Sequence, residues 1–343
     1  MRILLTLILI AAALWSGYWY VGSGRVEWAV ANWFAARRAE GWQADYRSLK
    51  VQGFPNRFDI VFDAPALADP ETGLAWSAPR LQVNALSYRP NHVIAVWPET
   101  QTIATPQQTY SLQSRDMRAS LVVSLRDRLA LQRSVLQADR LRILPRGADP
   151  EQRMTMEHLS LAADRLSEDE ARGDASGVPY RLGLRADGLR PPMAWRTQLG
   201  VQDRLPDRFD ALQADMTVRF DRPWDLRAIE QARPQPTHVR ITRAEARWGR
   251  LELAVAGTFD VEDGGHPAGE ITVKAKNWRE ILDLAVTSGA VPEQFAGTLQ
   301  GALSMMARGA GNPETLDIPL RLRGGRVWLG LVPLGRAPVL RLR

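Results

Sequence analysis

The four histidines are the first candidates for chemistry, because neutral imidazole is the commonest metal ligand and a frequent acid–base group. They lie far apart, at His92, His158, His238 and His266. None of them has the His-X-X-X-His or His-Glu-X-X-His spacing that places two imidazoles on one helical face. A local zinc site on a helix is therefore excluded, and we predict no metal site.

Paired carboxylates could supply a general acid and a general base, as they do in glycoside hydrolysis. Asp59 with Asp63, and the acidic residues between 260 and 263, lie in alternating stretches that are typical of solvated strand faces. The chain also lacks a Gly-X-Ser-X-Gly nucleophile elbow and a phosphate-binding loop. We predict no catalytic residue, no cofactor and no enzymatic activity; an exported hydrolase with a site assembled from distant residues is the least favoured alternative.

The charge composition argues against a nucleic-acid partner. Lysine occurs only at Lys50, Lys274 and Lys276, so nearly all of the 44 basic residues are arginine. The arginines are spread along the chain between Asp and Glu, whereas nucleic-acid binders gather them on one face. Cysteine is absent, so disulfides and thiolate chemistry are excluded and packing alone must hold the fold.

The N-terminus carries the strongest single signal, a short basic start followed by an apolar run. The strictly apolar part, Ile3 to Trp15, has the length of a signal-peptide core, and extending it to Val21 approaches the roughly 20 residues that span a bilayer. Aromatic residues follow where an interfacial belt belongs. We predict a membrane anchor over residues 1–22. Its candidate lipid-facing residues are Ile3, Leu5, Leu7, Leu9, Leu14, Trp15 and Trp19.

The orientation of this anchor follows from its flanking charge. Arg2 favours a cytoplasmic N-terminus, and the absence of a second long apolar run predicts that everything after residue 22 is exported. A cleaved signal peptide is the alternative, because Gly22 and Gly24 could supply the small residues before a cleavage site. Bulky aromatics crowd that region, so an uncleaved single-pass anchor is favoured.

Residues 23–45 predict a second, amphipathic helix just outside the membrane. Val26, Val30 and Phe34 share one face, Ser23 or Gly24 can cap the start, and arginines and glutamates lie largely off that face. Its apolar face either packs on the following sheet, which we favour, or lies on the membrane surface with the help of its arginines.

From residue 46 onward the hydrophobic period is two, which predicts a β-rich α+β fold. The alternation indicates strands with one wet and one dry face, and therefore a large, curved, mostly antiparallel sheet. "VEDGGHPAGE" and "RGGRVWLG" read as hairpin connections. The residues that we expect on the apolar sheet face are Phe58, Ile60, Phe62, Leu251, Leu253, Val255 and Phe259.

Helical spacing returns in two later stretches, which we expect to cover part of the sheet. The first, "NWREILDLAVTSG", opens with a capping-box pattern at Asn277 and Glu280, and the second is "PEQFAGTLQGALSMMARG". The acidic stretch 167–177 is the best internal boundary. It divides a first β-rich region, 46–166, from a second, 178–343, which we expect to share one continuous sheet.

Four stretches together resemble a known bacterial family. They are "GFPNRFDIVFDAPALADPETGLAWSAPRLQV", "NHVIAVWPETQTIATP", "WGRLELAVAGTFDVEDGGHPAGEITVKAKNW" and "PLRLRGGRVWLGLVPLGRAP". In order and spacing they resemble family 2125 of the domains of unknown function. The resemblance implies an inner-membrane-anchored envelope protein of Gram-negative bacteria, with its bulk in the periplasm, and it supplies no catalytic residues. A more distant likeness to the AsmA-like group implies a curved sheet whose apolar inner face carries lipid acyl chains.

Two functions fit these features. In the first, a non-enzymatic envelope protein holds or passes lipid or another hydrophobic ligand along its apolar sheet face, because the helices cover only part of that face. In the second, the dry face is a closed core, and the protein is a structural or assembly factor that binds other envelope proteins through loops or edges. An apolar groove several strands long would favour the first, and a sealed core would exclude it.

Overall fold

The chain folds into two compact units in the computed structural model, which describes residues 1–171, 175–230, 232–309 and 313–342. The N-terminal unit comprises Met1–Val123 and Leu136–Pro150, and the C-terminal unit comprises Ser124–Val135 and Glu151–Arg343. The division therefore does not fall at the acidic stretch 167–177. That stretch connects β11 (Met154–Arg165) to β12 (Val178–Asp187), and these two strands pair with each other inside the C-terminal unit.

The acidic stretch also contains a helical turn that the sequence interpretation missed. α2 (Glu168–Ala171) begins after Ser167, whose hydroxyl and backbone N–H both donate to Glu170, at 2.7 and 2.9 Å. The backbone N–H of Glu170 donates back to the Ser167 hydroxyl oxygen at 3.4 Å, which completes the reciprocal geometry of a capping box. Residues 172–174 of the stretch lie outside the described residues.

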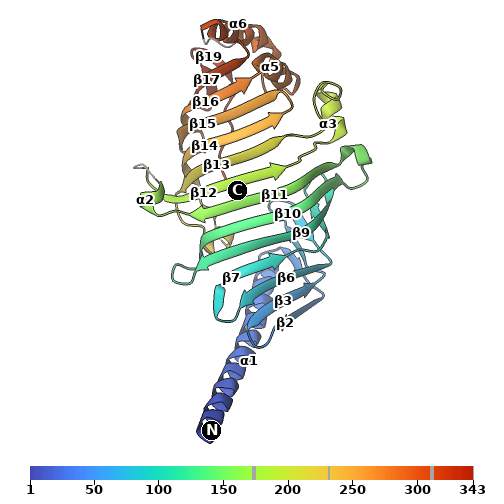
Figure 1. Ribbon diagram of the computed structural model, residues 1–343, viewed down its shortest axis with the longest axis vertical. Coiled ribbons are helices and arrows are strands. Elements are labelled where there is room, and N and C mark those ends of the chain that lie inside the picture. Colours follow the sequence, from blue (N-terminus) through green and yellow to red (C-terminus); the bar gives the residue numbers. More distant parts are fainter. Residues whose placement is uncertain (172–174, 231, 310–312, 343) are drawn as a thin grey trace. The chain divides into compact units, whose positions relative to one another are not determined.

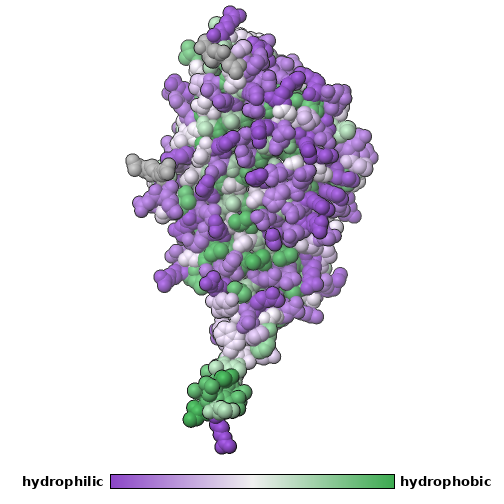
Figure 2. Space-filling model, in the orientation of Figure 1, coloured by the Kyte–Doolittle hydropathy of each residue, from purple (hydrophilic) through white to green (hydrophobic). Residues whose placement is uncertain are grey.

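The anchor and the amphipathic helix are one element rather than two. α1 (Arg2–Ala39) runs without a break through Ser23 and Gly24, where we expected a second helix to begin. The Ser23 hydroxyl donates to the carbonyl of Tyr20 within the helix, at 3.0 Å, instead of capping a new one. The N-terminal part of α1 is an exposed apolar projection (Figure 2), long and apolar enough to cross a membrane.

The second half of α1 packs on the sheet of its own unit, as we favoured from its apolar face. The Phe34 ring lies 4.8 Å from the ring of Tyr46 and 5.9 Å from that of Phe62, centroid to centroid. Val30 and Trp33 join the same cluster. Arg37, expected off this face, is only 5% exposed and pairs with Glu40 at 2.7 Å.

The sheet of the N-terminal unit is an antiparallel meander. Each of its first four long strands is broken into two shorter ones, β1 and β2, β3 and β4, β5 and β6, and β7 and β8. The strands are β1 (Gln43–Asp45), β2 (Ser48–Gln52), β3 (Arg57–Asp63), β4 (Ala66–Asp69), β5 (Leu74–Ser77), β6 (Arg80–Leu86), β7 (Arg89–Val96), β8 (Thr100–Ala104) and β9 (Thr109–Ser124). On one side of the interruptions β1, β4, β5, β8 and β9 are neighbours. On the other side β2, β3, β6, β7 and β9 are neighbours.

Proline explains two of these interruptions, because it has no N–H to donate to the ladder. Pro65 separates β3 from β4, and Pro79 separates β5 from β6. Two backbone hydrogen bonds hold the neighbouring segments together at these breaks. The N–H of Ala64 donates to the carbonyl of Pro79 at 2.9 Å, and the N–H of Ala78 donates to the carbonyl of Pro65 at 3.1 Å. Ala64 adopts a positive φ of 48°.

The sheet of the C-terminal unit follows the sequence order from β11 onward (Figure 1). After β11 and β12 come β13 (Ala211–Phe220), β14 (Pro236–Trp248), β15 (Leu251–Val261), β16 (Pro267–Lys276), β17 (Thr315–Arg323), β18 (Arg326–Leu329) and β19 (Val332–Arg336). β10 (Ala130–Pro145) contributes to both units. The predicted antiparallel, β-rich fold class behind a long apolar helix is confirmed.

Both predicted hairpin connections are present. β15 and β16 pair across residues 262–266, and β17 and β18 pair across Gly324 and Gly325. These two glycines have φ angles of 59° and 68°. Two consecutive positive φ angles are the signature of a type I′ turn, whose twist matches that of the flanking strands and which glycine adopts without steric cost.

The helices of the C-terminal unit gather mainly at one end of its sheet. α5 (Trp278–Thr287) and α6 (Glu293–Gly309) pack on β16 and β17 in a cluster around Trp278, Leu299 and Leu303. Shorter helices are α3 (Met193–Gln198), α4 (Arg227–Glu230) and a 3₁₀ turn, Pro150–Gln152. α4 lies within the Pro-rich stretch 221–237, and α3 was not expected.

The predicted capping box of α5 is wrong. Asn277 precedes the helix in a left-handed conformation, with φ 57° and no side-chain cap, and its amide donates to the carbonyl of Arg250. Glu280 turns to Arg250 and Arg204, at 2.7 and 3.1 Å. Two arginines from distant parts of the chain therefore outcompete the local backbone for this carboxylate.

Candidate functional site

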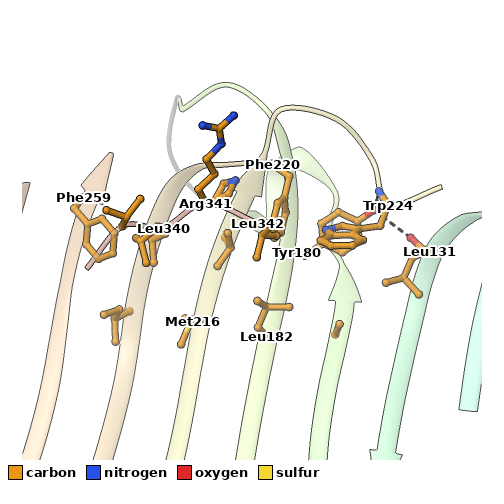
Figure 3. A pocket seen from close by; sticks show the side chains of 16 residues that line it. Leu131, Tyr180, Leu182, Met216, Phe220, Trp224, Phe259, Leu340, Arg341 and Leu342 are labelled. Atoms are coloured by element: carbon orange, nitrogen blue, oxygen red, sulfur yellow. Dashed lines mark hydrogen bonds between the residues drawn. The ribbon is translucent and has the colours of Figure 1, made fainter. Parts of the chain in front are cut away.

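The C-terminal unit has an apolar groove of about 720 Å³ on the dry face of its sheet. We call it the apolar groove. It is lined by Leu131, Ala163, Tyr180, Leu182, Met216, Val218, Phe220, Trp224, Pro236, Val239, Ile241, Phe259 and the segment from Val339 to Leu342. Figure 3 shows these side chains side by side on neighbouring strands.

The alternation of the strands places the groove floor. Tyr180 of β12 lies opposite Val218 of β13, which lies opposite Val239 of β14, which in turn lies opposite Phe259 of β15. One step along, Leu182 lies opposite Met216. Because alternate side chains of a strand share a face, the register aligns one row of apolar side chains across β12 to β15 and a second row across β12 to β14.

Three aromatic rings build one end of the groove. The Phe220 ring stands edge-on to the rings of Tyr180 and Trp224, with centroids 5.8 and 5.5 Å away. The backbone N–H of Trp224 donates to the Tyr180 hydroxyl at 3.2 Å, and this hydroxyl donates to the carbonyl of Leu131 at 3.4 Å. Burial raises the pKa of Tyr180. Its hydroxyl is thus neutral, partnered and structural.

An ion pair between the buried Asp225 and the partly exposed Arg227 fixes the segment that carries Trp224 between β13 and β14. Asp225 is 5% exposed and accepts from the Arg227 guanidinium at 2.7 and 2.9 Å. It also accepts from the backbone N–H of Arg227 at 3.0 Å. The hydrogen bonds from Arg227 hold the pKa of Asp225 below its ordinary value. The ionised carboxylate therefore closes a tight loop that presents Trp224 to the groove.

The C-terminal segment crosses the groove as a strap, which we define as Val339 to Leu342. Its backbone is held at two points. The N–H of Leu340 donates to the carbonyl of Gly265 at 2.8 Å, and Leu342 exchanges two hydrogen bonds with the Gln235 side-chain amide, at 2.8 and 3.0 Å. Among the described lining residues Arg341 alone is charged, and its guanidinium points away from the other labelled side chains in Figure 3.

The opposite end of the same dry face is closed. Leu251 packs with Trp248, Leu199, Val201 and Leu205, and helix α5 adds Ile281 and Leu284 to this cluster. Glu280 of α5 accepts hydrogen bonds from Arg250 and Arg204. These bonds hold the pKa of Glu280 below its ordinary value. Charged contacts at the rim and apolar contacts below it thus fasten the helices to this end.

The seven residues expected on one apolar face occupy several different environments. Of the four on β15, Phe259 lines the groove, Leu253 packs against the α5–α6 cluster, Leu251 lies in the closed end, and Val255 lies between these ends. Phe58, Ile60 and Phe62 belong to the N-terminal unit. There α1 covers them: Ile60 and Phe62 lie in the Phe34 cluster, and the Phe58 ring stacks on Trp19.

The predicted anchor residues also lie in two environments, one exposed and one buried against the sheet. Ile3, Leu5, Leu7, Leu9 and Leu14 are between 58% and 80% exposed, and Trp15 is 38% exposed. Trp19 is 6% exposed because it packs on the sheet. It therefore faces protein rather than solvent.

Sequence reasoning missed the aromatic end of the groove and the strap. Neither Tyr180 nor Trp224 was among the residues that we expected on the apolar sheet face. The one available signal for the strap was that Val339, Leu340 and Leu342 are apolar in an otherwise basic tail. Their contact with β14 and the 262–266 hairpin depends on the register of distant strands.

The histidines do not converge in the described parts of the chain. His238 Nδ1 lies 2.7 Å from Asp260 Oδ1, and His92 Nε2 lies 2.9 Å from Ser120 Oγ. Across residues 1–171, 175–230, 232–309 and 313–342, no group of three or more His, Asp or Glu side chains could hold a metal ion.

The comparisons with known proteins identify a family. No curated protein and no solved structure gives a significant match to the chain. A family model, described as an uncharacterized protein conserved in bacteria (DUF2125), matches residues 19–338. This span begins within the aromatic part of α1 and ends just before the strap. The chain belongs to this family of bacterial proteins, DUF2125.

Proposed function

We propose that the protein is a membrane-anchored envelope protein that holds a hydrophobic ligand, of the size of a lipid acyl chain, in the apolar groove. The single observation that carries the proposal is the groove itself. Its volume of about 720 Å³ falls in the usual range for small-molecule sites, and its lining is almost wholly apolar. Exposure of such an apolar lining to water costs free energy, which a bound hydrophobic ligand would recover.

The polar groups of the groove support binding rather than catalysis. The Tyr180 hydroxyl is engaged by the backbone of Trp224 and Leu131, and the Gln235 amide is engaged by Leu342. A catalytic site needs polar groups that converge on one reacting position. We therefore propose a role without catalysis, in which the strap and the Trp224 loop retain the ligand.

The long apolar helix supports anchoring in the inner membrane. Arg2 favours a cytoplasmic N-terminus, which would put both units in the periplasm. The contacts of Trp19 with the N-terminal sheet favour retention of the helix over cleavage at Gly22 or Gly24. Cleavage there would remove a 6%-exposed tryptophan from the fold.

The test is mass spectrometry of the full chain purified in mild detergent. Wild-type protein should carry more phospholipid or other lipid than an unrelated single-pass protein prepared in parallel. Met216→Trp, which fills the groove floor, should reduce bound lipid several-fold. Thr217→Trp, one residue along β13 and on the opposite face, is the matched control and should retain it. Wild-type lipid no higher than in the unrelated protein would overturn the proposal.

A further inference from the structure

Two hairpin tips of the N-terminal unit, β2–β3 and β6–β7, accept hydrogen bonds from one turn of α1. The indole N–H of Trp15 donates to the carbonyl of Pro55 at 3.0 Å, and that of Trp19 donates to the carbonyl of Arg57 at 2.7 Å. The Tyr18 hydroxyl donates to the carbonyl of Ser87 at 2.7 Å. Pro55 lies in the β2–β3 connection, Arg57 is the first residue of β3, and Ser87 lies in the β6–β7 connection. Both tips therefore stand level with residues 15–19 of the helix.

The two tips are also tied to each other. Ser87 is 0% exposed, and both its N–H and its hydroxyl donate to the carbonyl of Asn56, at 2.9 and 3.0 Å. Trp19 fills the space between the helix and β3, with its ring 6.0 Å from that of Phe58 and 5.5 Å from that of Phe54. The satisfied polar groups and the packed rings make this junction rigid.

The outside of the junction is unusually aromatic. Phe54 is 51% exposed and Tyr88 is 61% exposed, and on the helix Tyr18 and Tyr20 are 49% and 67% exposed. We call these four residues the aromatic collar. The tips at the other end of the same sheet, residues 70–73 and 105–108, read Pro-Glu-Thr-Gly and Thr-Pro-Gln-Gln. Large exposed aromatics thus occur at the end next to the apolar helix.

The length of the apolar run sets the level of the collar against a bilayer. Ile3 to Val21 rises about 28 Å at 1.5 Å per residue, close to the roughly 30 Å thickness of the hydrocarbon core. If α1 spans the bilayer, Tyr18 and Tyr20 lie in the last turn of this run, so the collar lies where the hydrocarbon core meets the headgroup layer, a position in which tyrosine and tryptophan are enriched. Arg57 and Arg89 are exposed beside the two tips, where they can reach lipid phosphates.

We infer that Phe54 and Tyr88 insert into the headgroup layer of the leaflet that faces the folded units, so that the N-terminal unit docks on the bilayer in a fixed orientation. The inference rests on the proposed membrane span of α1. Because α1 is continuous and the tips are bonded to it, the bilayer contacts a helix and two hairpin tips that form one surface.

The absence of cysteine allows a direct test with single-cysteine variants of the full chain. Each variant is spin-labelled and reconstituted in vesicles of phosphatidylethanolamine and phosphatidylglycerol. Collisions with oxygen and with a water-soluble nickel chelate then report depth. Phe54→Cys and Tyr88→Cys probe the tips. Leu74→Cys, at the far end of the same sheet and 47% exposed in the native chain, is the matched control. Leu9→Cys reports the span itself.

Labels at positions 54 and 88 should be several-fold less accessible to the nickel chelate than the label at 74, and the label at 9 should be the deepest. Equal nickel access at 54, 88 and 74, with position 9 in hydrocarbon, would overturn the docking while leaving the anchor intact. An aqueous label at position 9 would overturn both. Because Phe54 also contacts Trp19, position 88 keeps the test decisive if the Phe54→Cys variant folds poorly.

Discussion

In the N-terminal unit a single helix lies along the apolar sheet face, whereas in the C-terminal unit two helices cover only one end of theirs. α1 is covalently continuous with the apolar segment and packs through aromatic rings, from Trp19 at one end to Phe34 at the other. α5 and α6 are held at one end, and a four-residue strap crosses the other. The same alternating sequence pattern thus yields a closed face in one unit and a groove in the other.

The difference teaches that what covers a sheet, rather than the sheet itself, decides whether its dry face is core or binding surface. A fully covered apolar side chain contributes its whole burial energy to stability. A side chain that lines a groove contributes less to stability and remains available to a ligand. Four pairs of substitutions can break or sharpen this comparison, taken from the largest expected effect to the smallest.

Truncation of the covered face should cost most. Phe34→Ala removes a 5%-exposed ring that contacts Tyr46 and Phe62, and we expect a loss of about 3–5 kcal/mol in the free energy of unfolding. Ile241→Ala, in the half-buried groove wall, should cost about half as much. Chemical denaturation in detergent, resolved by hydrogen exchange in peptides of each unit, measures both. Equal costs would mean that the groove is packed like a core.

The cover of the C-terminal unit should depend on charge, unlike that of the N-terminal unit. Glu280→Gln removes the carboxylate that accepts from Arg250 and Arg204, and should cost about 1.5–3 kcal/mol at pH 7. Because the pKa of Glu280 is lowered from its ordinary 4.5, the ionised form stabilises the fold. That contribution is complete above the ordinary pKa and is lost as the pH falls through the lowered value.

Wild type and Glu280→Gln should therefore converge in stability in acid. The exposed pair of Glu252 and Lys276 provides the control, and Glu252→Gln should change stability by less than about 1 kcal/mol at either pH. Hydrogen exchange of α5 as a function of pH checks this expectation. A cost of Glu280→Gln that stays constant from neutral to acidic pH would show that the charge is not what fastens the helix.

The closeness of α1 to its sheet can be tested with one methyl group. At Gly22 a Cβ would stand 2.8 Å from the Phe58 ring, whereas at Gly24 nothing lies within 4 Å. Gly24→Ala should stabilise the helix by up to about 1 kcal/mol, because alanine has the higher helix propensity. Gly22→Ala should instead destabilise by about 1–2 kcal/mol, because the ring or the helix must move. Thermal unfolding in detergent compares them; equal stabilisation would contradict tight packing.

The strap should give the smallest effect. Gln235→Ala removes the two hydrogen bonds to Leu342 and should cost about 1 kcal/mol locally, which corresponds to exchange of the Leu342 amide roughly several-fold faster. The amide of Leu340, bonded to Gly265, should stay protected. Gln202→Ala, on an exposed turn, serves as the control. Unchanged exchange at Leu342 would mean that the strap does not depend on Gln235.

Much of the fold could be predicted from local pattern. Period-two alternation indicated the strands on both sides of the 262–266 and Gly324–Gly325 turns, and helical spacing indicated α5 and α6. The prediction of a helix cap was wrong where distant side chains compete for the capping carboxylate. Asn277 and Glu280 have the letters of a capping box, but Arg250 and Arg204 take the carboxylate. Ser167 and Glu170 lack such competition and form the box.

The same reasoning predicted only part of the candidate site. Phe259 was expected on the apolar face because its strand alternates, and it does line the groove. Leu251 lies on the same strand and the same face as Phe259, but it packs under helix α5 instead. Alternation specifies which face a residue occupies, and contains no information on what will cover that face.

The sequence by itself determined the apolar N-terminal helix, the antiparallel alternation and the family to which the chain belongs, because these depend on neighbouring residues and their order. Only the tertiary structure decided that α1 covers Phe58, Ile60 and Phe62, and that Tyr180, Trp224 and the strap enclose a groove beside Phe259. Those outcomes depend on contacts between segments far apart in the chain. The assembled sheet decides which side chains are buried, which residues lie opposite each other and which groups form hydrogen bonds. No local stretch of sequence contains both residues of such a contact.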